Sequence, residues 1–185
     1  MYVKQKLLKY LLFVYLASQV SYYIFAPLYA LFARNFGLNP RSISFIWGFY
    51  SFSVAVFILI FGRLENKIRK GKMIFFGYFI STISTMSLLF VHNSKSLVLV
   101  LFISALGTGI AVPAYKTMYG KNENKGKESQ QWSWLDAGNM FAGALGAGLG
   151  GVIVGAYGFH GLFIAMSIIQ FTATVIAYKK IYKYG

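Results

Sequence analysis

Long apolar runs alternate with short polar stretches along the whole chain. Strands of a membrane barrel would be about 9–11 residues long, with apolar and polar residues in strict alternation, and no run has that pattern. Each run instead approaches the ~20 residues that an α-helix needs to cross ~30 Å of hydrocarbon. The pattern therefore predicts an all-α integral membrane protein, a single domain formed by a bundle of six transmembrane helices. The predicted spans are residues 7–32, 43–61, 73–91, 97–115, 134–157 and 162–178.

The composition agrees with a protein that faces lipid. Of the 185 residues, 57% are hydrophobic and only 12% are charged, whereas soluble domains carry about 25% charged residues. So few ionic groups cannot cover a water-soluble fold of this size, and the lipid bilayer is therefore the first expected partner. Lys4, Lys6 and Lys9 precede the first run as in a signal peptide, but no small-residue cleavage site ends that run. We interpret the run as an uncleaved span.

The net charge of +14 raises the alternative of nucleic-acid binding, because clustered Lys and Arg neutralise phosphates. The positions of the charges favour another explanation. Of the 18 Lys and Arg, all but Arg34, Arg41 and Lys95 lie in the N-terminal tail, after the second and fourth runs, or at the C-terminus. Positive residues gather on the cytoplasmic side of membrane proteins. The sequence therefore predicts a multi-pass cell-membrane protein with both termini cytoplasmic and no nucleic-acid partner. Two paired copies would have to be parallel.

The first span carries polar residues at its centre, among them Gln19, Tyr22 and Tyr23. Pro27 cannot donate a hydrogen bond to the carbonyl of Tyr23, so a kink is expected there. One interpretation is a helix that lines a cavity and offers these polar groups to a substrate. The other is hydrogen bonding between helices plus a benign proline kink. The sequence leaves both open.

The fifth span is rich in small residues at a spacing of four. Small residues allow another helix backbone to come close, which matters because burial alone does not bring helices together in lipid. These residues form two neighbouring rows: the first row is Gly138, Ala142, Gly146 and Gly150, and the second row is Gly143, Ala147, Gly151 and Gly155. The rows indicate either tight packing within one bundle or contact with a second bundle.

Asp136 is the one acid that falls inside a predicted span. An acid within the membrane is expensive without a partner and is by default a functional candidate. Lys116, near the end of the fourth span, is its expected partner. The two residues form either a cytoplasmic gate or protonation site, or a structural ion pair.

Motifs of enzymes and of metal sites are missing from the sequence. There is no cysteine, which excludes disulfides and thiolate ligands. His92 and His160 lie at predicted outer ends of spans without a carboxylate nearby. No nucleophile elbow, phosphate loop or pair of carboxylates follows the known spacings. The sequence therefore indicates a protein that is not an enzyme and that needs no metal or cofactor.

The loop after the second span has a recognisable spacing of charges. Gly62 is followed by Asn66, Lys67, Arg69 and Lys70. This loop resembles the signature of the major facilitator superfamily, which is Gly, three residues, an acid, a base, one residue, Gly and two bases. Asn66 stands at the position of the acid and Arg69 at that of the second Gly. Glu65, one residue earlier, is expected to point about 100° away around a helical end.

A second likeness to the same superfamily lies in the fourth and fifth spans. It is carried by Pro113-Ala114-Tyr115, the stretch NKGKES, and GNMFAGALGAGLGG followed by YGFHGLF. The resemblance covers nearly the whole chain and implies one half of a transporter whose two six-helix halves are related by an axis along the membrane normal.

The resemblance implies transport of a small solute by alternating access, with a parallel homodimer rebuilding a 12-helix transporter. It places the first and fourth spans on the cavity, and the second and fifth spans at the contact with the other half. A heterodimer with another half, or a piece of a longer chain, remains open. Proton-driven and substrate-driven transport are both compatible with the sequence. The alternative function is a non-transporting membrane subunit that packs on a partner through the fifth span.

Overall fold

The computed structural model describes residues 2–184, and their side chains from Gln5 onward. Within these residues the fold is entirely helical and contains no strand. Short 3₁₀ turns at Ala26–Leu28 and Leu88–Phe90 join or end the longer helices, and a π-helical turn, Ala177–Ile181, ends the last one. The helices are α1 (Tyr2–Phe25), α2 (Tyr29–Arg34), α3 (Pro40–Leu64), α4 (Lys70–Ser87), α5 (Ser94–Asn122) and α6 (Glu128–Ile176).

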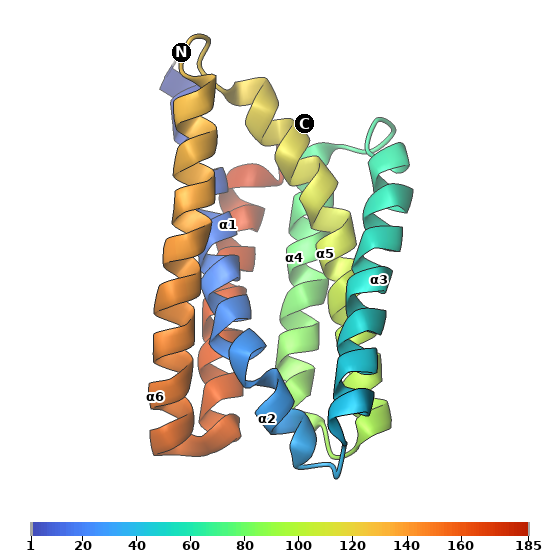
Figure 1. Ribbon diagram of the computed structural model, residues 1–185. Helices are drawn as coiled ribbons and strands as arrows, with labels where there is room; N and C mark the ends of the chain where they lie inside the picture. The colour runs from blue at the N-terminus through green and yellow to red at the C-terminus, as the bar shows by residue number, and fades with distance from the viewer. Residues whose placement is uncertain (1, 185) are drawn as a thin grey trace.

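Five helical stretches of the described chain are long and apolar enough to cross a membrane. The sequence predicts six, and the difference arises because the fifth and sixth predicted spans share α6. Gly158 interrupts α6 with φ 65° and ψ −173°, a conformation that glycine adopts without a steric cost. Figure 1 shows α6 turning back at the end of the bundle that lies away from the two chain termini, so that its two limbs run side by side. They are called the first limb (residues 128–157) and the second limb (residues 159–181).

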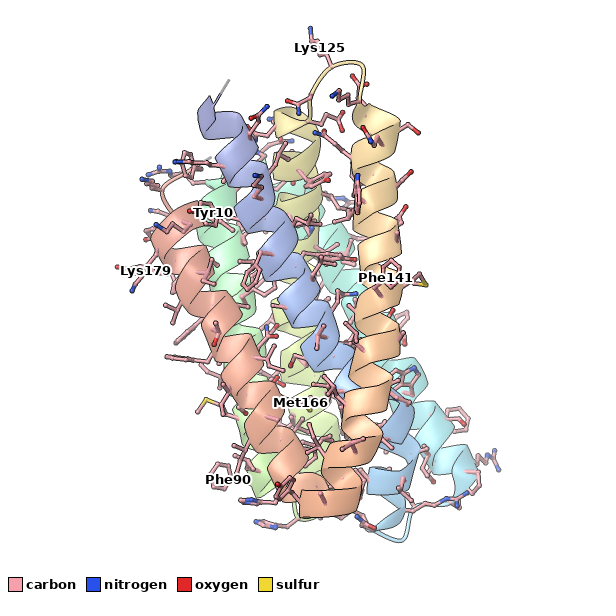
Figure 2. All side chains as sticks on the ribbon, turned by 90° about the vertical axis from the view of Figure 1, so that its left-hand side faces the viewer. Tyr10, Phe90, Lys125, Phe141, Met166 and Lys179 are labelled. Carbon is pink, nitrogen blue, oxygen red and sulfur yellow. The ribbon has the colours of Figure 1, made fainter. Side chains whose placement is uncertain are left out.

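The two ends of the bundle differ in charge. Both termini lie at one end, together with the α3–α4 and α5–α6 connections (Figure 1). Figure 2 shows Lys125 at this terminal end, Lys179 on the half of the bundle nearer to it and Phe90 near the opposite end. The basic residues therefore gather at one end of the bundle, as the charge pattern predicts. Which side of the membrane that end faces stays a prediction.

Local signals explain where the helices begin and bend. Asn39 accepts a hydrogen bond from the backbone N–H of Ser42, and Asn93 forms a reciprocal capping box with Ser96. Such caps satisfy N–H groups that the first turn of a helix leaves without partners. The break between α1 and α2 falls at Pro27, as expected from the missing donor of proline.

Close backbone contacts hold the helices together in two pairs. A Cβ on Gly150 would overlap the Ile24 carbonyl oxygen, so the first limb of α6 touches the backbone of α1 there. Between α4 and α5, Gly77 and Gly107 face each other in the same manner, since a Cβ on Gly107 would lie 2.8 Å from the Gly77 oxygen. Lipid gives helices no hydrophobic reason to associate, so such contacts supply much of the attraction.

Two apolar clusters lie toward the two ends of the bundle, with a polar layer between them. One contains Ile24 and Phe163, and the other contains Leu11 and Ile181. In the layer between, hydroxyl groups bridge neighbouring helices. The Ser21 hydroxyl donates to the Met166 carbonyl at 3.2 Å, and the hydroxyls of Thr82 and Thr174 lie 2.8 Å apart. Ser21 of α1 and Thr82 of α4 are thus hydrogen-bonded to the second limb of α6.

Gly150→Ala is expected to lower the free energy of unfolding by about 1–3 kcal/mol, because the added Cβ overlaps Ile24 and forces α1 away from the first limb. Gly148→Ala is the matched control on the same limb, since nothing lies within 4 Å of its added Cβ and alanine favours a helix over glycine. Thermal unfolding of the purified variants in detergent measures the difference. Equal stability of the two variants would contradict the importance of this contact.

Candidate functional site

A cavity of about 590 Å³ opens into the bundle and is lined by residues of α1, α3, α4, α5 and both limbs of α6. Its volume lies in the range of sites that hold small molecules, about 300–1,000 Å³. Aromatic rings and hydroxyl groups dominate the lining. The cavity is therefore the candidate functional site of the described chain.

An aromatic stack joins α1 to α5 at the cavity wall. The rings of Tyr15 and Tyr115 lie 5.0 Å apart and nearly parallel, and Tyr119 continues the stack at 5.9 Å from Tyr115. Across the cavity, Trp47 on α3 packs against Tyr50 at 5.5 Å. Aromatic pairs at such distances stabilise each other beyond their buried area. These pairs bring aromatic faces from α1, α3 and α5 to the cavity lining.

Of the polar residues at the centre of the first span, two belong to the cavity lining and one packs on the first limb. Gln19 and Tyr22 line the cavity. The Gln19 side-chain amide also donates to the Asn139 oxygen on the first limb, and the Tyr22 ring lies 6.4 Å from that of Trp47. Tyr23 is not among the lining residues of the described chain. Its ring lies beside Gly143 of the first limb, so Tyr23 takes part in helix packing in this structure.

Lys116 and Asp136 both line the cavity, from α5 and from the first limb, and both are exposed. Among the side chains from residue 5 to 184, the recorded ion pair joins Lys70 to Glu65, and Lys116 does not pair with Asp136. The two charges thus line one cavity without forming the expected ion pair. Their role as a gate stays a prediction.

The sequence analysis missed the wall that α4 and the second limb contribute. Ser81, Ser84 and Gln170 line the cavity there. The signal was present in Gln170, which is the one amide inside the predicted sixth span. The sequence alone could not place Gln170 at the cavity, because the neighbours of the second limb become known only once the chain folds back at Gly158 and the limb packs against α4.

Three buried polar atoms of the described chain have no hydrogen-bond partner: the Tyr115 hydroxyl, Nε2 of Gln170 and the hydroxyl of Ser167. Tyr115 and Gln170 border the cavity and Ser167 does not. A buried polar group without a partner costs about 1–3 kcal/mol. Two of the three unpartnered groups therefore belong to residues that line the candidate site.

The α3–α4 loop holds an acid that the sequence analysis judged wrongly. Glu65 does not point away. It is 8% exposed, accepts a hydrogen bond from the Thr117 hydroxyl at 2.9 Å and lies 3.8 Å from the Lys70 ammonium group. Glu65 keeps helical φ and ψ at the end of α3 and its N–H bonds to the Phe61 carbonyl, so its side chain projects from the helix toward Thr117 of the neighbouring α5. Asn66, the residue at the expected acid position, is exposed.

The other residues of the loop motif lie around this contact. Gly62 lies next to α5, since a Cβ added there would be 3.9 Å from the Cβ of Pro113. Lys67 is exposed. Arg69 donates to the Lys183 carbonyl at 2.6 Å, and the Gly71 N–H donates to the Tyr184 carbonyl at 2.8 Å. The loop is therefore tied both to α5 and to the C-terminal segment.

The two rows of small residues have different surroundings. In the first row, Gly138 packs on Leu16, Ala142 is buried, and Gly146 and Gly150 touch α1. In the second row, Gly143 meets the ring of Tyr23, whereas Ala147 is exposed and nothing lies within 4 Å of an added Cβ at Gly151 or Gly155. The first row thus packs within one bundle. Most of the second row is open surface.

Within the described residues, no group of three or more His, Cys, Asp and Glu lies close enough together to hold a metal ion. The chemistry of the cavity is that of hydrogen bonds, aromatic faces and two isolated charges.

The sequence profile of the Major Facilitator Superfamily matches residues 11–183. Among curated relatives, the chain is 25% identical over 174 residues to the Multidrug resistance protein MdtG of Salmonella schwarzengrund (strain CVM19633). The same protein of Salmonella agona (strain SL483) matches equally well. Each alignment covers 92% of this chain and 42% of the relative.

Two solved structures share the fold. The POT family transporter PepTSo has a TM-score of 0.80 at 16% identity, and the match covers 97% of this chain and 38% of that one. The peptide transporter POT in complex with sulfate also has a TM-score of 0.80, at 21% identity, with 95% and 38% covered. The chain therefore spans less than half the length of the proteins that it matches.

Glu65→Ala is expected to lower the free energy of unfolding by about 1.5–3 kcal/mol, the usual contribution of a hydrogen bond to a charged group. The variant removes the acceptor of Thr117 and the partner of Lys70. Asn66→Ala, at the exposed neighbouring position, is expected to stay within about 0.5 kcal/mol of the original protein. Thermal unfolding in detergent compares them, and a larger loss in the Asn66 variant would contradict the observed role of Glu65.

Proposed function

Because the chain belongs to the Major Facilitator Superfamily, we propose that it carries a small solute across the cell membrane by alternating access. The active form is a parallel homodimer in which two copies rebuild a 12-helix transporter. The observation that carries the proposal is the cavity, whose polar and aromatic lining comes from every long helix of the bundle.

The chain matches less than half of each relative. It spans 42% of its curated relatives and 38% of the similar solved chains, so one copy supplies about one half of such a protein. In transporters built from two halves, substrate sites lie near the middle of the membrane at the contact between them. A second copy supplies the missing wall of the cavity.

Exposed apolar surface on α3 and the first limb supports a contact there. Only Ile43, Tyr50 and Ser53 are buried on α3, whereas Phe45 and Phe52 are each 67% exposed. The open part of the second row, including Gly151 and Gly155, lies on the first limb. Small residues let another helix backbone approach closely. The second copy uses this surface, and lipid covers the rest.

The basic terminal end faces the cytoplasm, since positive residues are retained on that side. Both copies then have the same orientation. Gln19 and Tyr22 contact the solute, while Tyr23 packs on Gly143 of the first limb. Lys116 and Asp136 approach each other when the cytoplasmic side of the cavity closes, which gives them the role of a gate. The relatives named multidrug resistance proteins favour a drug-sized solute.

The second candidate function is a non-transporting membrane subunit that packs on a partner through the second row. The observation in its favour is the open surface at Gly151 and Gly155. Transport measurements distinguish the two functions, because a scaffold depends on the exposed surface of the first limb and moves no solute through the cavity.

Expression in a bacterial strain without its main drug-efflux pumps is expected to change the cellular accumulation of at least one drug-sized solute. Gln19→Leu and Tyr22→Ala are expected to abolish most of that change, because both side chains line the cavity. Tyr157→Ala, at a position 76% exposed on the first limb, is the control. Unchanged accumulation across a chemically diverse panel of solutes, with the protein present in the membrane, would favour the scaffold function.

The role of Asp136 as a gate residue is tested in the same assay. Full transport by the Asp136→Asn variant would contradict that role.

Oxidative cross-linking tests the dimer, and the chain contains no cysteine that would interfere. Gly151→Cys or Gly155→Cys is expected to yield a disulfide-linked dimer in native membranes, since a disulfide needs Cα atoms about 5.5–6 Å apart. Ile83→Cys, equally accessible on α4, is expected to stay monomeric. Dimers at Ile83 alone, or at none of the three positions, would contradict the proposed contact.

A further inference from the structure

The charges of the cavity cancel. Lys116 and Asp136 are the two charged residues among those that line it, and the described chain brings no further ionic group to its wall. An ion that leaves water needs an unopposed opposite charge to offset its lost hydration. Asp136 attracts a cation, but Lys116 in the same wall repels it, and the reverse holds for an anion. The charged side chains of the lining therefore sum to zero and give neither kind of ion a net Coulombic attraction.

The same wall contains hydrogen-bond donors that are not in use. The residues Tyr115 and Gln170 are each 3% exposed and border the cavity. Their hydroxyl and Nε2 atoms have no hydrogen-bond partner within the described chain. A phenol and a primary amide can both donate to an oxygen acceptor. No acceptor of the protein competes for them, so a solute that brings an acceptor to this wall displaces no existing bond.

Aromatic rings complete the lining. Trp47, Trp132 and Tyr15 come from three different helices and all line the cavity. Tyr15 is held by its stack on Tyr115, with ring centroids 5.0 Å apart. Trp132 is held by a hydrogen bond from its Nε1 to Glu123 at 2.9 Å. Fixed flat surfaces of this kind bind aromatic or other apolar parts of a solute.

From these three observations we infer that the cavity selects solutes without net charge that combine apolar, preferably aromatic, surface with a strong oxygen acceptor. The acceptor is bound by Tyr115 and Gln170, and the rings cover the apolar part. This substrate class rests on the proposed function of the cavity in transport. It excludes recognition based on the charge of a cation or an anion.

Three probes of similar size separate the possibilities: triphenylphosphine oxide, which is neutral with one strong acceptor oxygen, the tetraphenylphosphonium cation and the tetraphenylborate anion. Binding is followed by tryptophan fluorescence of the full chain in detergent. Trp47 and Trp132 line the cavity, and Trp134→Phe removes the third tryptophan, which is 64% exposed outside it. The oxide is expected to bind at least about tenfold more tightly than either ion, a difference that corresponds to about one hydrogen bond.

Tyr115→Phe and Gln170→Leu are each expected to weaken binding of the oxide about tenfold, since each removes one donor. Two controls are matched to them. Tyr119→Phe removes a hydroxyl that donates to the Gln131 carbonyl away from the cavity, and Ser167→Ala removes the third unpartnered group, which does not line it. Both are expected to bind the oxide as the original protein does.

Tighter binding of tetraphenylphosphonium that is lost in Asp136→Asn would overturn the inference, because charge would then decide recognition. Affinity for the oxide that is unchanged in both donor variants, or no binding of any probe, would overturn it as well. Since these measurements need no transport, they are independent of the accumulation assay. Ionic solutes that are transported while the oxide does not bind would leave the transport function standing and remove only this substrate class.

Discussion

The structure depends first on close backbone contact between helices, because lipid gives apolar helices no hydrophobic drive to associate. Gly146 and Gly150 bring the first limb of α6 onto the backbone of α1, and Gly77 and Gly107 do the same for α4 and α5. In lipid, such contacts replace the hydrophobic effect as the reason for association. Gly109 of α5 likewise meets Phe57 of α3, and side chains from all the long helices then surround the cavity.

Polar groups could be placed in this interior because the helices already satisfy their own backbones. Several hydroxyls bond to a carbonyl one turn earlier, as Thr82 does to Tyr78 and Thr85 to Ser81. Tyr115 and Gln170 break this pattern, since their donors find no partner. The inferred solute supplies the acceptor that these two donors lack.

Much of the helical fold follows from the sequence, because a span must be long, apolar and free of charge. The break at Pro27 and the basic terminal end were predictable for the same reason. The sequence could not place Glu65, because the neighbour of its carboxylate, Thr117 on α5, becomes known only from the packing of the helices. It could not separate Tyr23 from Tyr22 either, because which face of α1 meets Gly143 is decided by the packing of the first limb. The sequence also cannot show which segments far apart in the chain form one cavity wall, as Ser84 and Gln170 do; only the tertiary structure brings them together.

The central claim is that one chain is half of a working transporter and that a second copy completes it. Counting subunits tests it most directly: each chain carries one fluorescent protein in native membranes at low expression, and the bleaching steps of single spots are counted. Two steps per spot are predicted in the large majority of complexes, after correction for dark fluorophores. A distribution dominated by single steps would contradict the account.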